Sequence, residues 1–136
     1  LAIDYRQGGP EDLAEAGGYD AVISLEVIED VAERAAFLSA LARAARPGGK
    51  VFLSTLNRTP RSFLMAKLGA EYLLRLLPVG THDWRMFVTP AELGAGLRGA
   101  GLSVADIAGM EMGLSGTWRI TRDTGVNYLM MAQKPA

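Results

Sequence analysis

The sequence predicts an α/β fold with a mostly parallel sheet, and two observations support this prediction. Segments with the composition of strands alternate with segments of helical periodicity along the whole chain, which is typical of βαβ units. The apolar run Ala21-Val22-Ile23 is typical of a strand buried on both faces, as strands of parallel sheets are. No internal repeat or low-complexity linker interrupts the 136 residues, so we expect one domain.

The first half of the chain is expected to form two strands, a helix and a third strand. The first two strands are predicted at residues 2–7 and Tyr19–Leu25, with glycines in the connection between them. Apolar residues at helical spacing predict a helix over residues 31–46, and Pro47-Gly48-Gly49 is expected to end it. The next strand is predicted at residues 51–55, which completes a βαβ unit.

The second half begins with a predicted helix over residues 61–77, which Pro78 ends. Thr89-Pro90-Ala91-Glu92 then combines a capping residue, a proline suited to the first helical position and the glutamate of a capping box. This pattern predicts a helix to about residue 100, with Gly101 as its stop. Strands are predicted at residues 102–107, 118–121 and 126–132, and the last two are expected to be antiparallel because they are closely spaced.

Composition excludes several classes of function. The formal net charge is -1, so the chain lacks the basic field that binds phosphates, and nucleic acid is not an expected partner. The absence of cysteine excludes a disulfide framework, a thiolate nucleophile and a zinc site with thiolate ligands.

Three carboxylates follow the predicted strand Tyr19–Leu25, at the edge where ligands bind in open α/β sheets. If the segment forms one helical turn, Glu26, Glu29 and Asp30 project to one side, and their oxygens suit a hard cation such as Mg²⁺. Acidic residues are also common at helix starts, where they complement the helix dipole. Both interpretations stay open at this point.

The single histidine, His82, precedes Asp83 in a polar segment. A histidine beside an aspartate can be an oriented acid or base, although a structural hydrogen-bonding role is more common. The two roles differ in the loss of activity expected on His82→Gln.

The predicted helix over residues 61–77 is apolar except for one narrow stripe of charge. Such a helix can belong to the core, lie in a membrane interface or cover an apolar ligand. Arg58 and Arg61 at its start would suit anionic lipid.

Several of these segments resemble a known family. Residues 19–31 and 46–50 resemble two successive motifs of the class I S-adenosylmethionine (SAM) methyltransferases. Residues 54–58, 69–83 and 126–129 more specifically resemble the ubiquinone biosynthesis O-methyltransferases. The resemblance implies a Rossmann-like fold with an antiparallel C-terminal strand. It also implies SAM-dependent O-methylation of a catechol or hydroquinone that carries a polyprenyl tail.

The resemblance implies roles for individual residues. The family pattern has a histidine where this chain has Asp30, which is still an acceptable magnesium ligand. A segment at about residues 57–83 is expected to be an insertion that meets lipid and substrate. The implied site comprises Gly9, Pro10 and Leu25 for the cofactor, Glu26, Glu29 and Asp30 for Mg²⁺, His82 and Asp83 for proton transfer, and Asn57, Arg58, Arg61 and Tyr72 for substrate or lipid.

The glycine-rich cofactor loop of the family, and the acidic residue that follows its second strand, are not found in the 136 residues. We therefore expect this chain to be the C-terminal part of one methyltransferase domain, in a protein about 100 residues longer. The implied location is cytoplasmic, peripheral to the inner (plasma) membrane, with an anionic lipid surface and other ubiquinone biosynthesis enzymes as partners. Two alternatives are a methyltransferase for another small molecule and a non-catalytic lipid-binding fragment.

Overall fold

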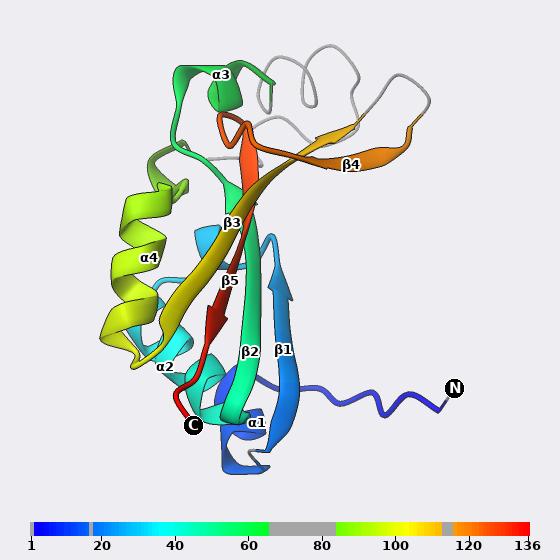
Figure 1. Ribbon diagram of the computed structural model, residues 1–136, viewed down its shortest axis with the longest axis vertical. Helices are drawn as coiled ribbons and strands as arrows, with labels where there is room; N and C mark the ends of the chain where they lie inside the picture. Colours follow the sequence, from blue (N-terminus) through cyan, green and yellow to red (C-terminus); the bar gives the residue numbers. More distant parts are fainter. Residues whose placement is uncertain (1, 17, 66–83, 113–115) are drawn as a thin grey trace.

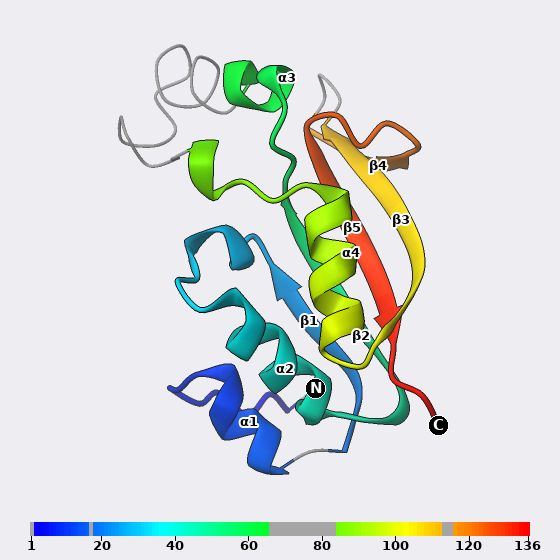
Figure 2. The ribbon, with the colours of Figure 1, turned by 90° about the vertical axis from the view of Figure 1, so that its left-hand side faces the viewer.

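The computed structural model describes residues 2–16, 18–65, 84–112 and 116–136. In this part of the chain, one mixed sheet carries helices on one of its faces (Figures 1 and 2). Its described strands lie in the order β1-β2-β5-β3-β4. Their bounds are Tyr19–Leu25 for β1, Ala45–Leu56 for β2, Ser103–Met112 for β3, Trp118–Thr121 for β4 and Asn127–Gln133 for β5. The predicted α/β class is confirmed.

The directions of the strands confirm a parallel pair and an antiparallel C-terminal strand. Strand β1 pairs with β2 in parallel, whereas β5 lies between β2 and β3 and is antiparallel to both. Strands β1, β2 and β3 therefore run in the same direction. The predicted antiparallel pairing of β4 with β5 is wrong, because β3 is long enough to pair with β5 along its first part and with β4 at its end.

Three helices, α1 (Pro10–Ala16), α2 (Arg34–Ala44) and α4 (Pro90–Gly99), lie on the same side of the sheet (Figure 2). The predicted capping box of α4 is present. The Thr89 hydroxyl accepts from the Glu92 backbone N–H at 3.2 Å, and the Glu92 carboxylate accepts from the Thr89 N–H at 2.9 Å. Gly101, with a φ of 83°, follows the helix as its predicted stop.

The core lies between this helical layer and the sheet. Its side chains are apolar and come from both layers, so burying them removes a large apolar area from water and stabilises the fold. Its members include Leu38, Leu41, Val51, Leu53, Leu93, Leu97, Tyr128 and Met130.

Several predicted boundaries are wrong. Residues 2–7 form no strand; they are exposed and lead away from the sheet (Figure 1). The helix predicted over residues 31–46 begins only at Arg34, after a 3₁₀ turn, η1, at Ile28–Asp30. Strand β2 begins at Ala45, before the expected glycine stop, because the backbone around Gly48 and Gly49 hydrogen-bonds with Lys134 at the end of β5.

The helix predicted over residues 61–77 is only partly described. A short helix, α3, spans Pro60–Phe63 and starts with a capping box between Thr59 and Ser62. Residues 66–77 lie outside the described part of the chain. Another 3₁₀ turn, η3, covers Trp84–Met86. Within the described ranges, no helix has both the length and the apolarity needed to cross a membrane.

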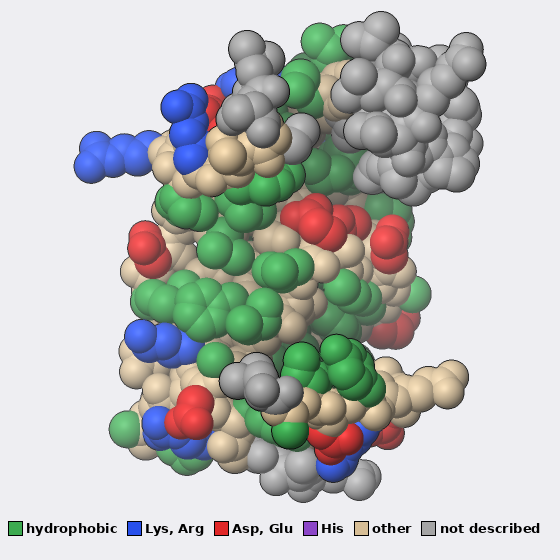
Figure 3. Space-filling view, turned by 90° about the vertical axis from the view of Figure 1, so that its right-hand side faces the viewer, with side chains coloured by type: hydrophobic (Ala, Val, Ile, Leu, Met, Phe, Trp, Pro, Cys, Tyr) green, Lys and Arg blue, Asp and Glu red, His purple; other side chains and the backbone are tan. Residues whose placement is uncertain are grey.

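The second face of the sheet carries none of the labelled helices. Val22 points into the core, so its neighbour Ile23 points to the other face, where it is exposed. Figure 3 shows hydrophobic side chains spread over this face. The large exposed apolar residues on the strands are Tyr19, Ile23, Leu25, Ile107, Trp118 and Ile120.

Candidate active site

The chain turns sharply at Glu26, directly after β1. Glu26 has a φ of 52°, in the left-handed region that residues other than glycine rarely adopt. Its backbone N–H donates to the carbonyl oxygen of Ser54 at 3.0 Å and lies 3.2 Å from the Ser54 hydroxyl oxygen. Such a conformation costs about 1–3 kcal/mol and is common at functional sites. Strand β2 therefore holds the turn in place.

Two carboxylates meet beside this turn, each held by a hydroxyl group from the end of β2. Ser54 Oγ donates to Glu26 Oε1 at 2.7 Å, and Thr55 Oγ1 donates to Glu29 Oε2 at 2.8 Å. Loss of hydration at the Glu26 carboxyl, together with the charge of Glu29, raises the pKa of Glu26 to about 7, although the Ser54 hydrogen bond opposes the change. Near neutral pH, Glu26 can therefore gain or lose a proton, as a general acid or base must.

The predicted magnesium ligands are only partly brought together. In the described ranges, no group of three or more His, Cys, Asp or Glu side chains could hold a metal ion. Glu26 and Glu29 are neighbours, but Asp30 does not complete such a group. The reason is the 3₁₀ geometry of η1, in which one residue turns the direction by about 120°, so Glu29 and Asp30 diverge. The remaining pair offers two oxygen atoms of the kind that Mg²⁺ prefers, and a cation would relieve the repulsion between the two carboxyls, which adds to burial in raising the pKa of Glu26.

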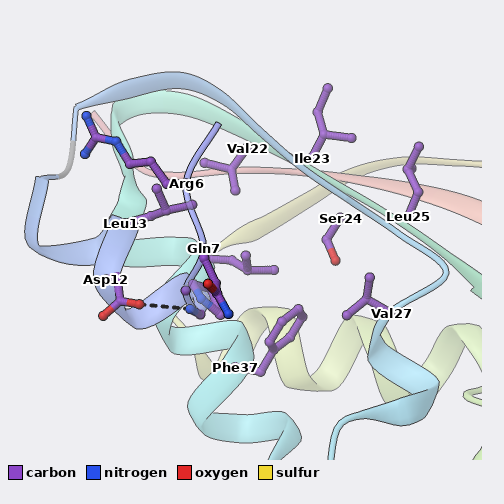
Figure 4. A pocket seen from close by; sticks show the side chains of 14 residues that line it. Arg6, Gln7, Asp12, Leu13, Val22, Ile23, Ser24, Leu25, Val27 and Phe37 are labelled. Atoms are coloured by element: carbon purple, nitrogen blue, oxygen red, sulfur yellow. Dashed lines mark hydrogen bonds between the residues drawn. The ribbon is translucent and has the colours of Figure 1, made fainter. Parts of the chain in front are cut away.

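A cavity lies around the free edge of β1, and all three residues predicted to bind the cofactor line it. Gly9, Pro10 and Leu25 border a volume of about 390 Å³, within the range of small-molecule sites. In Figure 4, Leu25 lies on the opposite side of β1 from Phe37, so the cavity extends around the edge of the strand. The Gly9 N–H donates to the Asp12 carboxylate at 2.9 Å, which fixes one wall.

The residues predicted to meet substrate or lipid anchor the start of the segment at residues 57–83. Asn57 is buried, and its side-chain amide donates to the carbonyl oxygen of Thr124 at 2.8 Å. Arg58 forms an ion pair with Glu92 of α4, and Arg61 forms one with Asp123. Both arginine charges are therefore paired within the chain. Tyr72, His82 and Asp83 lie outside the described residues.

No role was predicted from the sequence for Ser54, Thr55 or Tyr128. A role for Ser54 and Thr55 could have been predicted from their position, because they are two adjacent hydroxyl residues at the end of an apolar strand. The Tyr128 hydroxyl donates to the Val88 carbonyl oxygen at 2.9 Å, which ties β5 to the segment before α4. Burial, and then the charges of Glu92, Glu29 and Glu26, raise the pKa of Tyr128, so its phenol stays neutral.

Comparisons with known proteins point to one family. The methyltransferase domain family matches residues 3–107. The ubiquinone biosynthesis O-methyltransferase of Methylobacterium nodulans is 49% identical over 137 residues, which cover 99% of this chain and 55% of that protein. The protein of the same name from Pseudomonas paraeruginosa is 47% identical, over 100% of this chain and 60% of its own length. The chain thus spans little more than half the length of these curated relatives.

Solved structures of methyltransferases are similar to this chain in fold. A magnesium protoporphyrin IX methyltransferase from Synechocystis PCC 6803, solved with bound SAH, is 26% identical with a TM-score of 0.56; the match covers 90% of this chain and 48% of that one. A SAM-dependent methyltransferase from Thermotoga maritima has a TM-score of 0.62 at 13% identity, covering 87% of this chain and 56% of that one. The second likeness supports the fold alone.

Proposed function

Because this chain belongs to the methyltransferase domain family, we propose that it is the C-terminal part of a SAM-dependent O-methyltransferase of ubiquinone biosynthesis. Its substrate is a catechol or hydroquinone with a polyprenyl tail. The observation that carries this proposal is the 47–49% identity, along essentially the whole chain, to relatives with that name. Among the described strands, β1 is hydrogen-bonded to a neighbour on one side only, which supports placing the remaining part of the domain beside it.

The cofactor would lie in the cavity at the edge of β1. Gly9, Pro10 and Leu25 supply apolar and backbone surface there, while Ser24 and Gln7 add polar groups. This mixture suits SAM, which has an aromatic base and several polar groups. The cavity adjoins the end of β1, so a bound cofactor would lie next to the turn at Glu26.

The carboxylates would act on the substrate hydroxyl. A free phenol has a pKa of about 10, so little of it is ionised at neutral pH, and the enzyme must lower the free-energy cost of removing its proton. In the absence of a bound metal ion, Glu26 would be placed to accept this proton, because its pKa lies near neutral pH. When Mg²⁺ is bound, Glu26 and Glu29 would instead serve as two of its ligands, and the ion would supply Lewis-acid stabilisation of a phenolate. His82 and Asp83 remain further candidates for proton transfer.

Methyl transfer by the complete gene product would test this function. Purified protein is incubated with labelled SAM and with matched catechols that do or do not carry a short prenyl tail. We expect transfer to the tailed catechol, and loss of most of it in a Glu26→Gln, Glu29→Gln double variant with chelator present. Equal transfer to both substrates would favour a methyltransferase for another small molecule. A protein that does not bind SAM would be a non-catalytic, lipid-binding one.

We also propose that the segment at residues 57–83 contacts an anionic lipid surface, which would place the protein in the cytoplasm at the periphery of the inner membrane. Exposed Phe63, Leu64, Met65 and Trp84 support this contact, because such side chains are stabilised by burial in an interface. Arg58, Arg61 and Tyr72 remain candidates for contacting lipid or substrate. Other enzymes of ubiquinone biosynthesis would meet the protein at the same surface.

Co-sedimentation with vesicles would test the membrane contact. We expect the complete protein to bind vesicles rich in anionic lipid better than zwitterionic ones. A Leu64→Ser, Met65→Ser variant should bind less, and Ile120→Ser, which changes an exposed apolar residue on β4, serves as its control. Equal binding of both variants would argue against this surface.

A further inference from the structure

Two hydroxyl groups at the end of β2 are withdrawn from solvent. Ser54 is 2% exposed and Thr55 is 0% exposed. Ser54 pairs with Leu25 of β1, and Thr55 pairs with Tyr128 of β5, so both lie where the carboxyl end of β2 meets its neighbouring strands. Successive residues of a strand point to opposite faces, so neither hydroxyl could replace the other.

Each hydroxyl group donates its hydrogen bond to one carboxylate oxygen. Ser54 donates to Glu26 Oε1, and Thr55 donates to Glu29 Oε2. Hydrogen bonds to ionised acceptors are shorter and stronger than those between neutral groups, so these contacts orient both side chains. The two carboxyls also contact each other, because a side-chain hydrogen bond with Glu29 is one of the interactions that raise the pKa of Glu26.

A buried hydroxyl in this protein does not need a carboxylate to satisfy it. Ser62, which is also buried, donates to backbone carbonyl oxygens instead. Withdrawing the Glu29 carboxylate from water is costly, and the turn at Glu26 adds backbone strain. Because backbone carbonyl oxygens can serve as acceptors for buried hydroxyl groups, the need for an acceptor does not explain an arrangement that includes both a buried carboxylate and a strained backbone.

We propose that Ser54 and Thr55 are positioning residues that hold the Glu26 and Glu29 carboxylates in the orientation in which they face the substrate hydroxyl and its metal ion. This inference deepens the proposed function and rests on it. The two hydroxyls act through the carboxylates and touch neither substrate nor cofactor. Their loss should therefore affect metal affinity and turnover and leave the KM for SAM unchanged.

The test compares Thr55→Val, which removes the hydroxyl and keeps the shape, with Thr55→Ser, which keeps the hydroxyl. Tyr128→Phe is the matched control, because it removes another buried hydroxyl at the paired position of β5 without a hydrogen bond to either carboxylate. Each variant is made in the complete gene product. Calorimetry measures Mg²⁺ binding without substrate, and steady-state kinetics give kcat and both KM values.

Loss of an outer hydrogen-bonding partner typically lowers metal affinity or activity about 10- to 100-fold, and we expect this range for Thr55→Val. Thr55→Ser and Tyr128→Phe should stay within about threefold of wild type on the same measures. Ser54→Ala, which frees the Glu26 carboxylate, provides a second test if circular dichroism shows that Thr55→Val does not fold.

Wild-type values for both Thr55→Val and Ser54→Ala would overturn the proposal. So would equal losses in Thr55→Val, Thr55→Ser and Tyr128→Phe, because that pattern reports only the stability of the sheet. If wild type binds Mg²⁺ but transfers no methyl group, the proposed function fails, and the calorimetric comparison still decides the positioning role. A wild type with neither property overturns both.

Discussion

The titration of Glu26 should make the stability of the protein depend on pH. The pKa of Glu26 is about 7 in the folded protein, against an ordinary value of 4.5. The folded state binds this proton more tightly than the unfolded state does. Protonated Glu26 therefore contributes to the free energy of unfolding, and this contribution is fully present below pH 4.5. It is lost as the pH rises through 7.

The size of this effect follows from the two pKa values. At 1.36 kcal/mol per pKa unit, the difference between 4.5 and about 7 corresponds to at most about 3 kcal/mol. Glu26 is exposed as a whole residue, so solvent screening reduces this effect, and we expect about 1–2 kcal/mol. Glu26→Gln keeps the shape of the protonated side chain and does not titrate, so its stability should lack this part of the pH dependence.

Urea unfolding of wild type and Glu26→Gln from pH 4.5 to 8 measures the difference. The free energy of unfolding of wild type should fall relative to that of the variant as the pH rises. Asp20→Asn, which changes an exposed carboxylate at the start of β1, controls for removal of a charge. Parallel pH profiles for wild type and Glu26→Gln would refute the reasoning, because they would mean that Glu26 has the same pKa in both states.

Three further predictions concern the scaffold of the site, and thermal unfolding measures each. Thr89→Ala removes the N-cap of α4 and should cost about 1 kcal/mol, whereas Thr89→Ser should retain most of the stability. Leu53→Ala, in the core, should cost about 2–5 kcal/mol, and exposed Ile23→Ala under about 0.5 kcal/mol. Gly101→Ala should destabilise by about 1–2 kcal/mol because its φ is 83°, whereas Gly99→Ala within α4 should stabilise slightly. Equal effects within either of the last two pairs would contradict the assigned burial or backbone conformation.

Local chemistry made much of the fold predictable. The limits of β1 followed from an apolar run next to glycine, and the start of α4 followed from the capping residues Thr89 and Glu92. Both signals act between residues close in sequence, so one sequence is enough to read them. The boundaries of β2 failed because the strand continues through Gly48, where its hydrogen-bonding partners come from the far end of the chain.

The candidate site also has features that the sequence predicts and features that only the tertiary structure reveals. The sequence by itself determined that Glu26 and Glu29 follow a buried strand, whereas the helix that begins at Pro10 was not predicted. Only the tertiary structure decided that Glu29 meets Glu26 while Asp30 does not, and that Ser54 and Thr55 hold the pair. The physical reason is that a 3₁₀ turn and a left-handed residue set those directions, and the left-handed residue, Glu26, is held by hydrogen bonds from Ser54, 28 residues away in sequence.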